Sequence, residues 1–138
     1  GNVVDRIGVL RNRIVFRLLR KGTTRWGQSM KYRGTIFYWH PGTGETDEWR
    51  VTDGIVTDTR VSIDWSKGKE QGHLHADSAA GSRFRGEYKY SPSDGERRSF
   101  DLKMYSANDG EVLLFGTWVN HKSGSEGKWA FLLTPVEG

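Results

Sequence analysis

The stretch FRGEYKYSP, residues 84–92, has the clearest pattern in this sequence. Its aromatic residues Phe84, Tyr88 and Tyr90 fall on one side of a period-two alternation, and its charged residues fall on the other. This alternation predicts a β-strand with one buried side and one side in water. Gly86 lies mid-strand on the apolar side, where a glycine typically marks a bend or the close approach of another group. A polar turn follows at once, so the unit is an aromatic strand that ends in a turn.

Much of the chain repeats this plan, and eight strands are expected in all. The expected strands are 31–39, about 45–53, 55–65, 71–77, 83–90, 98–105, 111–120 and 128–136. Asp53-Gly54 marks a break between the second and third strands, and Asn108-Asp109-Gly110 is a strong hairpin signal. Mid-strand Gly34, Gly86 and Gly116 suit strongly coiled strands.

The order of these segments indicates a closed all-β fold. Consecutive strands with short connections favour antiparallel neighbours. Eight strands are enough to close a barrel that holds its own side chains or one small ligand. We therefore predict an antiparallel eight-stranded up-and-down β-barrel, of the architecture that streptavidin and lipocalins have. A two-sheet sandwich is the alternative.

Composition narrows the class of protein further. The chain has 138 residues, of which 35% are hydrophobic and 28% charged, which excludes a membrane bundle and a disordered chain. It has no cysteine, so disulfides and thiolate metal sites are excluded. The net charge of +4 suits an anionic ligand but is too small and scattered to indicate nucleic acid. No secretory signal or spanning segment is found, which fits the soluble part of a longer protein.

The first residues have a different pattern. Between 2 and 20, apolar residues recur at helical spacing among arginines, which predicts a short basic N-terminal helix. These apolar residues are Val3, Ile7, Leu10, Ile14 and Leu18. The helix would cover one barrel end or, because clustered arginine favours the cytoplasmic face of a membrane, would form a juxtamembrane segment. The part 13–21 also fits a strand. We assign 1–25 to this segment and 26–138 to a single barrel domain.

No group of residues indicates catalysis. His73, His75 and Asp77 share one face of an expected strand, and such a set can hold a divalent cation. An exposed polar face explains the same spacing, so no metal site and no cofactor are predicted. No nucleophile motif, phosphate loop or convincing acid–base pair occurs. We expect a protein that is not an enzyme; a hydrolase or isomerase in a barrel is the rival.

The aromatic residues give the candidate ligand site. Rings can stack on a nucleobase while nearby arginines pair with phosphate. The residues assigned to the site are Trp65, Tyr88, Tyr90, Trp118 and Trp129, with Arg60 and Arg85 as the basic partners. Trp39, Trp49, Arg33 and Arg50 are further members of the same aromatic and basic sets. Filling of a solid core explains the rings equally, and solvated outer faces explain the arginines.

Several segments resemble strands of streptavidin-like barrels. The segment FRGEY at 84–88, followed by the turn SPSDG at 91–95, is similar to one strand and turn of that family. LFGTW at 114–118 and WAFLLT at 129–134 are similar to later strands, whereas GTWVN at 116–120 is similar to the family's opening strand. The resemblance implies a barrel, and it carries over no biotin-binding residue.

A second resemblance is to the barrel domain of CBASS-type anti-phage effectors, which have two transmembrane helices before a β-barrel. YKYSP at 88–92 is similar to their tyrosine-rich strand, and LFGTW at 114–118 and GKWAF at 127–131 to their last two strands. The basic run 13–21 lies where such a chain would leave the membrane. The resemblance implies a cytoplasmic sensor, part of an inner-membrane protein, that binds a cyclic oligonucleotide and then self-associates.

These observations together predict a non-enzymatic ligand-binding barrel. The expected ligand is small and anionic, with a cyclic nucleotide as the named candidate, and binding is expected to promote oligomerisation. The alternatives are an avidin-like or lipocalin-like binder of another small molecule, and a protein-interaction barrel with a solid core.

Overall fold

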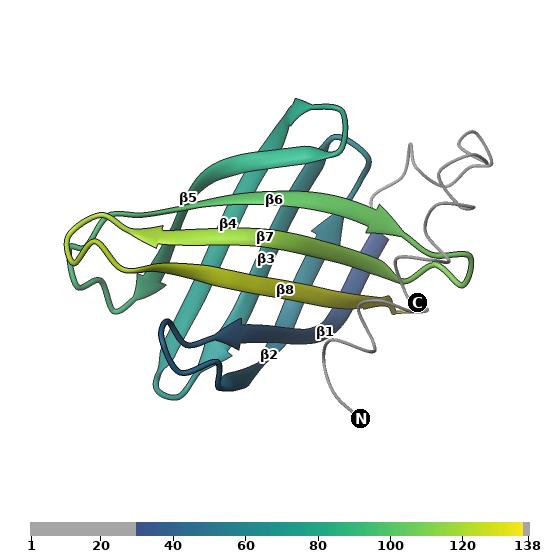
Figure 1. The fold of residues 1–138 in the computed structure, drawn as a ribbon. Coiled ribbons are helices and arrows are strands. Elements are labelled where there is room, and N and C mark those ends of the chain that lie inside the picture. The colour runs from purple at the N-terminus through teal and green to yellow at the C-terminus, as the bar shows by residue number, and fades with distance from the viewer. Residues whose placement is uncertain (1–29, 137–138) are drawn as a thin grey trace.

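The computed structural model describes residues 30–136, which form one closed barrel of eight antiparallel strands (Figure 1). The strands are β1 (Met30–Trp39), β2 (Thr46–Val56), β3 (Arg60–Lys67), β4 (Glu70–Ala80), β5 (Arg83–Ser91), β6 (Arg98–Ser106), β7 (Val112–Asn120) and β8 (Glu126–Pro135). Each strand pairs with the next along the chain, and β1 pairs with β8 to close the barrel. The predicted closed all-β barrel is confirmed, and the sandwich alternative is wrong. The helix predicted in 2–20 lies outside the described residues.

The boundary predicted between the second and third strands is wrong. Asp53-Gly54 lies within β2, where the pairing register with β3 shifts between Val51 and Asp53. The chain turns instead at 57–59. There the Thr57 hydroxyl accepts hydrogen bonds from the backbone amides of Thr59 (3.2 Å) and Arg60 (3.0 Å). A threonine hydroxyl thus stabilises a turn that contains neither glycine nor proline.

Two apolar clusters lie on opposite sides of the barrel wall. The larger one fills the interior with the inward residues of all eight strands, and its most buried members include Trp65, Trp129, Phe84 and Phe131. The second faces outward on β1, β6, β7 and β8, and we call it the outer cluster. It consists of Phe37, Trp39, Tyr105, Ala107, Leu113, Phe115, Ala130 and Leu132. Alternation along the strands separates the two sets, since neighbouring residues point to opposite faces.

Two glycines let the strands approach closely, as the sequence suggested for Gly34 and Gly116. A Cβ at Gly34 would lie 1.9 Å from the carbonyl oxygen of Leu132, and one at Gly116 would lie 1.9 Å from that of Asp101. No side chain fits at these distances without moving the neighbouring strand. Both glycines therefore mark places where the backbone of a neighbouring strand approaches closely.

The barrel has two different rims. The hairpin rim carries the connections 40–45, 68–69, 92–97 and 121–125. The terminal rim carries the connections 57–59, 81–82 and 107–111, together with the start of β1 and the end of β8 (Figure 1). Tyr32 and Pro135 are paired there, so the chain enters and leaves the barrel at the same place.

Candidate functional site

A column of aromatic rings occupies the half of the interior nearest the hairpin rim. Trp65, from β3, lies at its centre and is fully buried. Its ring centroid lies 5.8 Å from those of Tyr90 and Trp129, 5.9 Å from Phe131 and 6.2 Å from Tyr88. Most of these contacts are edge-to-face, an arrangement that aromatic pairs prefer. The inward positions of β3, β5 and β8 thus meet in one continuous set of rings.

A second group of rings lies above this column at the hairpin rim. Tyr38 is stacked between Trp49 and Trp118, with centroid distances of 4.8 and 5.0 Å. His40 meets Tyr38 edge-on at 5.1 Å. Tyr38 is half-buried, and burial, with a smaller effect of Asp47, raises the pKa of its hydroxyl above the ordinary value. This stack covers the column on the rim side.

Cross-strand glycines make room for two of the indoles. Trp65 is paired with Gly72 on β4, and Trp118 is paired with Gly127 on β8. A Cβ at Gly72 would lie 2.1 Å from an indole carbon of Trp65, and one at Gly127 would lie 2.8 Å from an indole carbon of Trp118. Each indole therefore lies directly over the backbone of the neighbouring strand, which fixes its orientation.

Three indole N–H groups in this region have no hydrogen-bond acceptor. The Nε1 atoms of Trp65, Trp118 and Trp129 are buried, and none has a partner among the described residues. The side chains are 0%, 4% and 1% exposed. A buried donor without a partner costs about 1–3 kcal/mol, so natural proteins rarely leave one unpaired. Two in the aromatic column and one in the stack above it identify the part of the molecule that has unused capacity for hydrogen bonding.

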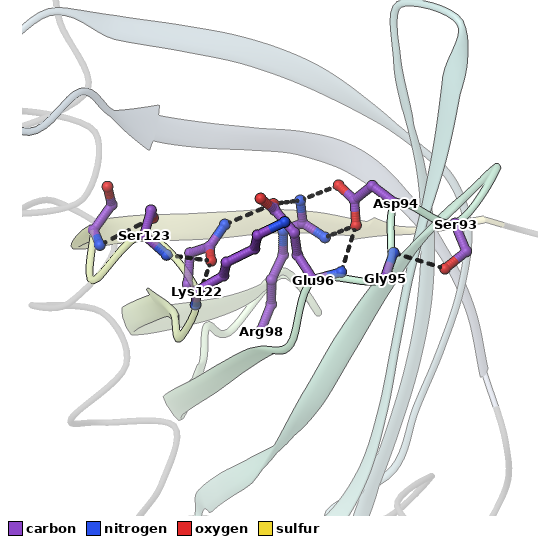
Figure 2. A network of polar contacts seen from close by, with 9 residues as sticks. Ser93, Asp94, Gly95, Glu96, Arg98, Lys122 and Ser123 are labelled. Atoms are coloured by element: carbon purple, nitrogen blue, oxygen red, sulfur yellow. Dashed lines mark hydrogen bonds and ion pairs between the residues drawn. The ribbon is translucent and has the colours of Figure 1, made fainter.

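A charged network lies at the hairpin rim (Figure 2), and its Arg98 lies over the ring of Tyr90. The Arg98 guanidinium donates to both carboxylate oxygens of Asp94, at 2.5 and 3.0 Å, and to Glu96 at 2.6 Å. Asn120 donates to the same Glu96 oxygen at 2.9 Å, which ties the end of β7 to the 92–97 connection. The Arg98 side chain is only 11% exposed. Hydrogen bonding from Arg98 and from the Glu96 amide holds the pKa of Asp94 well below its usual range.

Two cations lie over the rings at this rim. The Arg98 guanidinium carbon is 4.9 Å from the Tyr90 ring centroid, and the Lys67 ammonium is 4.9 Å from the same centroid and 5.1 Å from that of Trp49. Arg98 is neutralised by its two carboxylates, whereas Lys67 has no ion pair within the described part of the chain. Of the two cations that lie over the rings, Lys67 is therefore the one that can meet an anion without first losing a carboxylate.

Burial keeps the two column tyrosines neutral. It raises the pKa of Tyr90 to about 12 and raises that of Tyr88 further still. The nearby Trp65 indole favours the ionised form of Tyr90 to a smaller degree, but the geometry between the two groups falls short of a hydrogen bond. Burial therefore decides the direction, and both hydroxyls keep their protons at neutral pH.

The structure brings together five of the seven residues that the sequence assigned to the site. Trp65, Tyr88, Tyr90, Trp118 and Trp129 all face the interior and are buried. Arg60 and Arg85 do not join them, because both side chains lie on the outer surface and are 62% and 55% exposed. Arg60 donates to Asp77 at 2.7 Å, and Arg85 shares Asp101 with Arg83. Both arginines therefore lie on solvated outer faces, which was the alternative to a place in the ligand site.

The face of β4 that carries His73 and His75 is also part of the outer surface of the barrel. His73 is paired with Asp64 across β3 and β4 at 2.5 Å, and His75 and Asp77 are exposed on the same face. Within residues 30–136, no group of three or more histidine, cysteine or acidic side chains is placed to hold a metal ion.

Sequence reasoning missed Arg98, Lys67 and Tyr38. Arg98 lies two residues before Phe100 and four before Leu102, which both face inward, so the alternation along the strand could have placed Arg98 inside. Lys67 was placed in a loop, whereas it ends β3. Tyr38 is in phase with inward Ile36, but its stacking partners come from two other strands, which no local pattern reveals.

Comparison with protein-family models, curated proteins and solved structures finds no significant match to this chain. None of the described residues forms a helix long and apolar enough to cross a membrane. The site is therefore interpreted from its own geometry.

Proposed function

We propose that this barrel is a non-enzymatic binding module for a small, planar, anionic ligand that reaches the aromatic column from the hairpin rim. The observation that carries this proposal is the set of three buried indole N–H groups, on Trp65, Trp118 and Trp129, that have no acceptor among residues 30–136. A ligand that presents oxygen or ring-nitrogen acceptors to them satisfies donors that the protein leaves unpaired.

Ring chemistry defines the shape of this ligand. The column offers aromatic faces and edges, which favour a flat ring system over a sugar or an alkyl chain. The stack of Tyr38 between Trp49 and Trp118 has to separate before a ligand passes the rim. Tyr38 is half-buried and lies near the end of β1, so it is the ring best placed to move.

Charge at the rim supports an anion. The Lys67 ammonium lies over two ring faces, where it can contact a phosphate or carboxylate while the flat part of the ligand stacks. Arg98 already has two carboxylate partners that offset its positive charge. The rim therefore favours a ligand of low negative charge. A cyclic nucleotide combines a flat base, several acceptors and a low charge per phosphate, and is the first candidate ligand.

The wider biological role has support from sequence resemblance alone. Segments 88–92, 114–118 and 127–131 are similar to strands of CBASS-type effector barrels. On that basis we place the module in the cytoplasm, as the sensor of a membrane-anchored antiviral effector that self-associates when the ligand binds. A different small molecule bound in an avidin-like or lipocalin-like manner is the alternative ligand class.

Titration calorimetry against a panel of cyclic mono-, di- and trinucleotides tests the proposal. We expect heat for at least one member and, in a parallel NMR titration, shifts in the indole N–H signals of Trp65, Trp118 and Trp129. The chain has six tryptophans, so the six signals can be assigned by single Trp→Phe variants. Trp39, in the outer cluster, is the internal control whose signal stays in place.

A matched pair of variants separates binding from folding. Trp129→Phe keeps a ring in the column but removes one donor, and we expect it to weaken binding about fivefold to tenfold, the value of one hydrogen bond. Trp39→Phe should leave affinity unchanged. If the folded protein gives no heat and no indole shift with any member of the panel, the nucleotide proposal fails.

A further inference from the structure

We propose that the outer cluster is the docking face for the amphipathic segment 3–18 of the same chain. The cluster is a continuous apolar surface on the outside of β1, β8, β7 and β6. Strand pairing aligns its members, since Phe37 lies opposite Ala130 and Leu113 lies opposite Leu132. This proposal is independent of the ligand proposed above.

The burial of the cluster is the first observation that points to a covering element. Phe37 is 1% exposed, Leu113 and Ala130 are 0% exposed and Leu132 is 9% exposed, although all four point away from the interior. Residues 30–136 form only the strands of the wall and their short connections (Figure 1), so within this range no further layer lies outside the wall.

Other outward residues on the same strands have the exposure expected of a barrel surface. Arg33 on β1, Lys103 on β6 and Thr117 on β7 are all exposed. The buried outward positions are therefore confined to one patch and do not reflect the curvature of the whole wall. Partial cover comes from the rings of Trp39, Tyr105 and Phe115 at its edges. A hydrophobic element of limited width fits this pattern.

The segment before β1 has the matching chemistry. At 100° per residue, Val9 and Phe16 fall on the far side of a helix over 3–18, and Val4 and Val15 widen its apolar side to about 140°. Within that side, the five other apolar residues form a stripe of about 80°. These residues are Val3, Ile7, Leu10, Ile14 and Leu18. Arg6, Arg13 and Arg17 fall beside the stripe, and Asn12 falls on the opposite side.

Length and position also fit. A helix over 3–18 would be about 24 Å long, and β1 is about 33 Å long, so the helix is shorter than the strand that it would lie along. The intervening residues 19–29 reach up to about 35 Å when extended, enough for the chain to reverse before β1 begins at Met30. Because β1 is itself part of the cluster, the segment is tethered beside its docking face.

Charge at the terminal rim complements the segment. The connection 107–111 carries Asp109 and Glu111 next to the cluster member Ala107. Arginines beside the apolar stripe would face this acidic rim when the stripe lies on the cluster. The short tether to β1 favours the segment of the same chain over a second copy of the barrel or a membrane surface, and those two occupants are outcomes of the test below.

A thiol-accessibility scan of the full chain tests the proposal directly. The chain has no cysteine, so each single Cys variant reports on one position. We expect Ile7→Cys, Leu10→Cys and Ile14→Cys to react with a maleimide at least about tenfold more slowly than Asn12→Cys, because only the former positions are covered. Equal rates at all four positions would overturn the proposal.

A charge insertion gives the second readout, on the cluster itself. In Leu10→Asp, we expect the Trp39 indole signal to shift and its hydrogen exchange to accelerate, whereas Asn12→Asp should leave both unchanged. If Leu10→Asp does not fold, the cysteine scan alone decides. An unchanged Trp39 signal in folded Leu10→Asp contradicts docking. Two other results would give the outer cluster a different occupant, namely sedimentation of the wild type as a dimer or its flotation with anionic vesicles. Either result contradicts docking of the segment if Leu132→Asp abolishes the association and Leu10→Asp does not.

Discussion

The two halves of the barrel interior are built from different chemistry on the same strands. Toward the hairpin rim the inward side chains are rings, among them Trp65 and Trp129, and they include donors without acceptors. Toward the terminal rim the inward positions are mostly aliphatic, such as Val56, Val61 and Val112. The aliphatic half closes as an ordinary core, so we assign the stability of the barrel mainly to it and binding to the ring half.

The largest expected effect comes from adding one methyl group beneath the ring column. Gly72→Ala places a carbon 2.1 Å from the buried Trp65 indole, so the whole column has to shift. We expect a loss of about 3 kcal/mol in the free energy of unfolding, at the upper end of overpacking effects. Urea denaturation measures it.

Gly54→Ala is the matched control in β2, because there the nearest atom to the added carbon lies at 3.4 Å. Its cost should stay below about 1 kcal/mol. Equal losses for the two variants would mean that the column is no more tightly packed than the rest of the wall.

The second effect is a loss of stability at alkaline pH, which arises in the ring half of the interior. Tyr88 and Tyr90 have raised pKa values when folded, so between the unfolded value of 10.0 and the folded value of about 12 for Tyr90 the folded state holds more protons. Stability is therefore complete below pH 10 and falls as pH rises through this window, by about 2 kcal/mol for Tyr90 alone, and Tyr88 adds to this loss. Urea midpoints measured from pH 8 to pH 12 test this.

The Tyr88→Phe/Tyr90→Phe double variant lacks both hydroxyls and should lose most of this pH dependence. A variant whose midpoint falls between pH 10 and pH 12 as steeply as that of the wild type would contradict the burial of the two hydroxyls.

Trimming a ring should cost less in the ring half than in the aliphatic half. Trp129→Phe loses apolar area but also removes an unpaired donor, so we expect a net loss of about 1 kcal/mol or less. Phe84→Leu, fully buried near the terminal rim, has no such offset and should cost about 1–2 kcal/mol. The two free energies of unfolding, measured side by side, distinguish the halves. A larger loss for Trp129→Phe would indicate that its N–H is satisfied.

The smallest effect is expected at the rim network. Asp94→Asn removes the carboxylate to which Arg98 donates its hydrogen bonds. Asp94 is solvent-exposed, and ion pairs at exposed positions contribute little to the stability of the fold. The depressed pKa of Asp94 contributes stability that is present above about pH 3.8 and is lost as pH falls through the folded pKa. The gap in melting temperature between wild type and variant should therefore narrow below pH 4.

Asp58→Asn, in the 57–59 connection at the terminal rim, is the control and should show no gap at either pH. A gap between wild type and Asp94→Asn that persists unchanged in acid would exclude the proposed linkage.

Local alternation predicted most of the fold and the members of the ring column. Arg60 alternates with Val61 and Arg85 with Phe84, so parity placed both arginines outside once those strands were assigned. The turn at 57–59 escaped prediction because a threonine hydroxyl, not a glycine, stabilises it. The hydrogen bond between Asn120 and Glu96, which completes the Arg98 network, could not be read from the chain, because it joins β7 to a connection more than twenty residues earlier.

The seam between β1 and β8 has a consequence for biosynthesis. The barrel's first strand is made first and finds its outer partner only when the last strand has left the ribosome. Until then β1 and the newest strand both present open backbone edges, which invite pairing with other chains. The ring half of the interior is also incomplete until then, because Trp129 and Phe131 belong to β8. We therefore expect a nascent chain truncated before β8 to be the form most prone to aggregate.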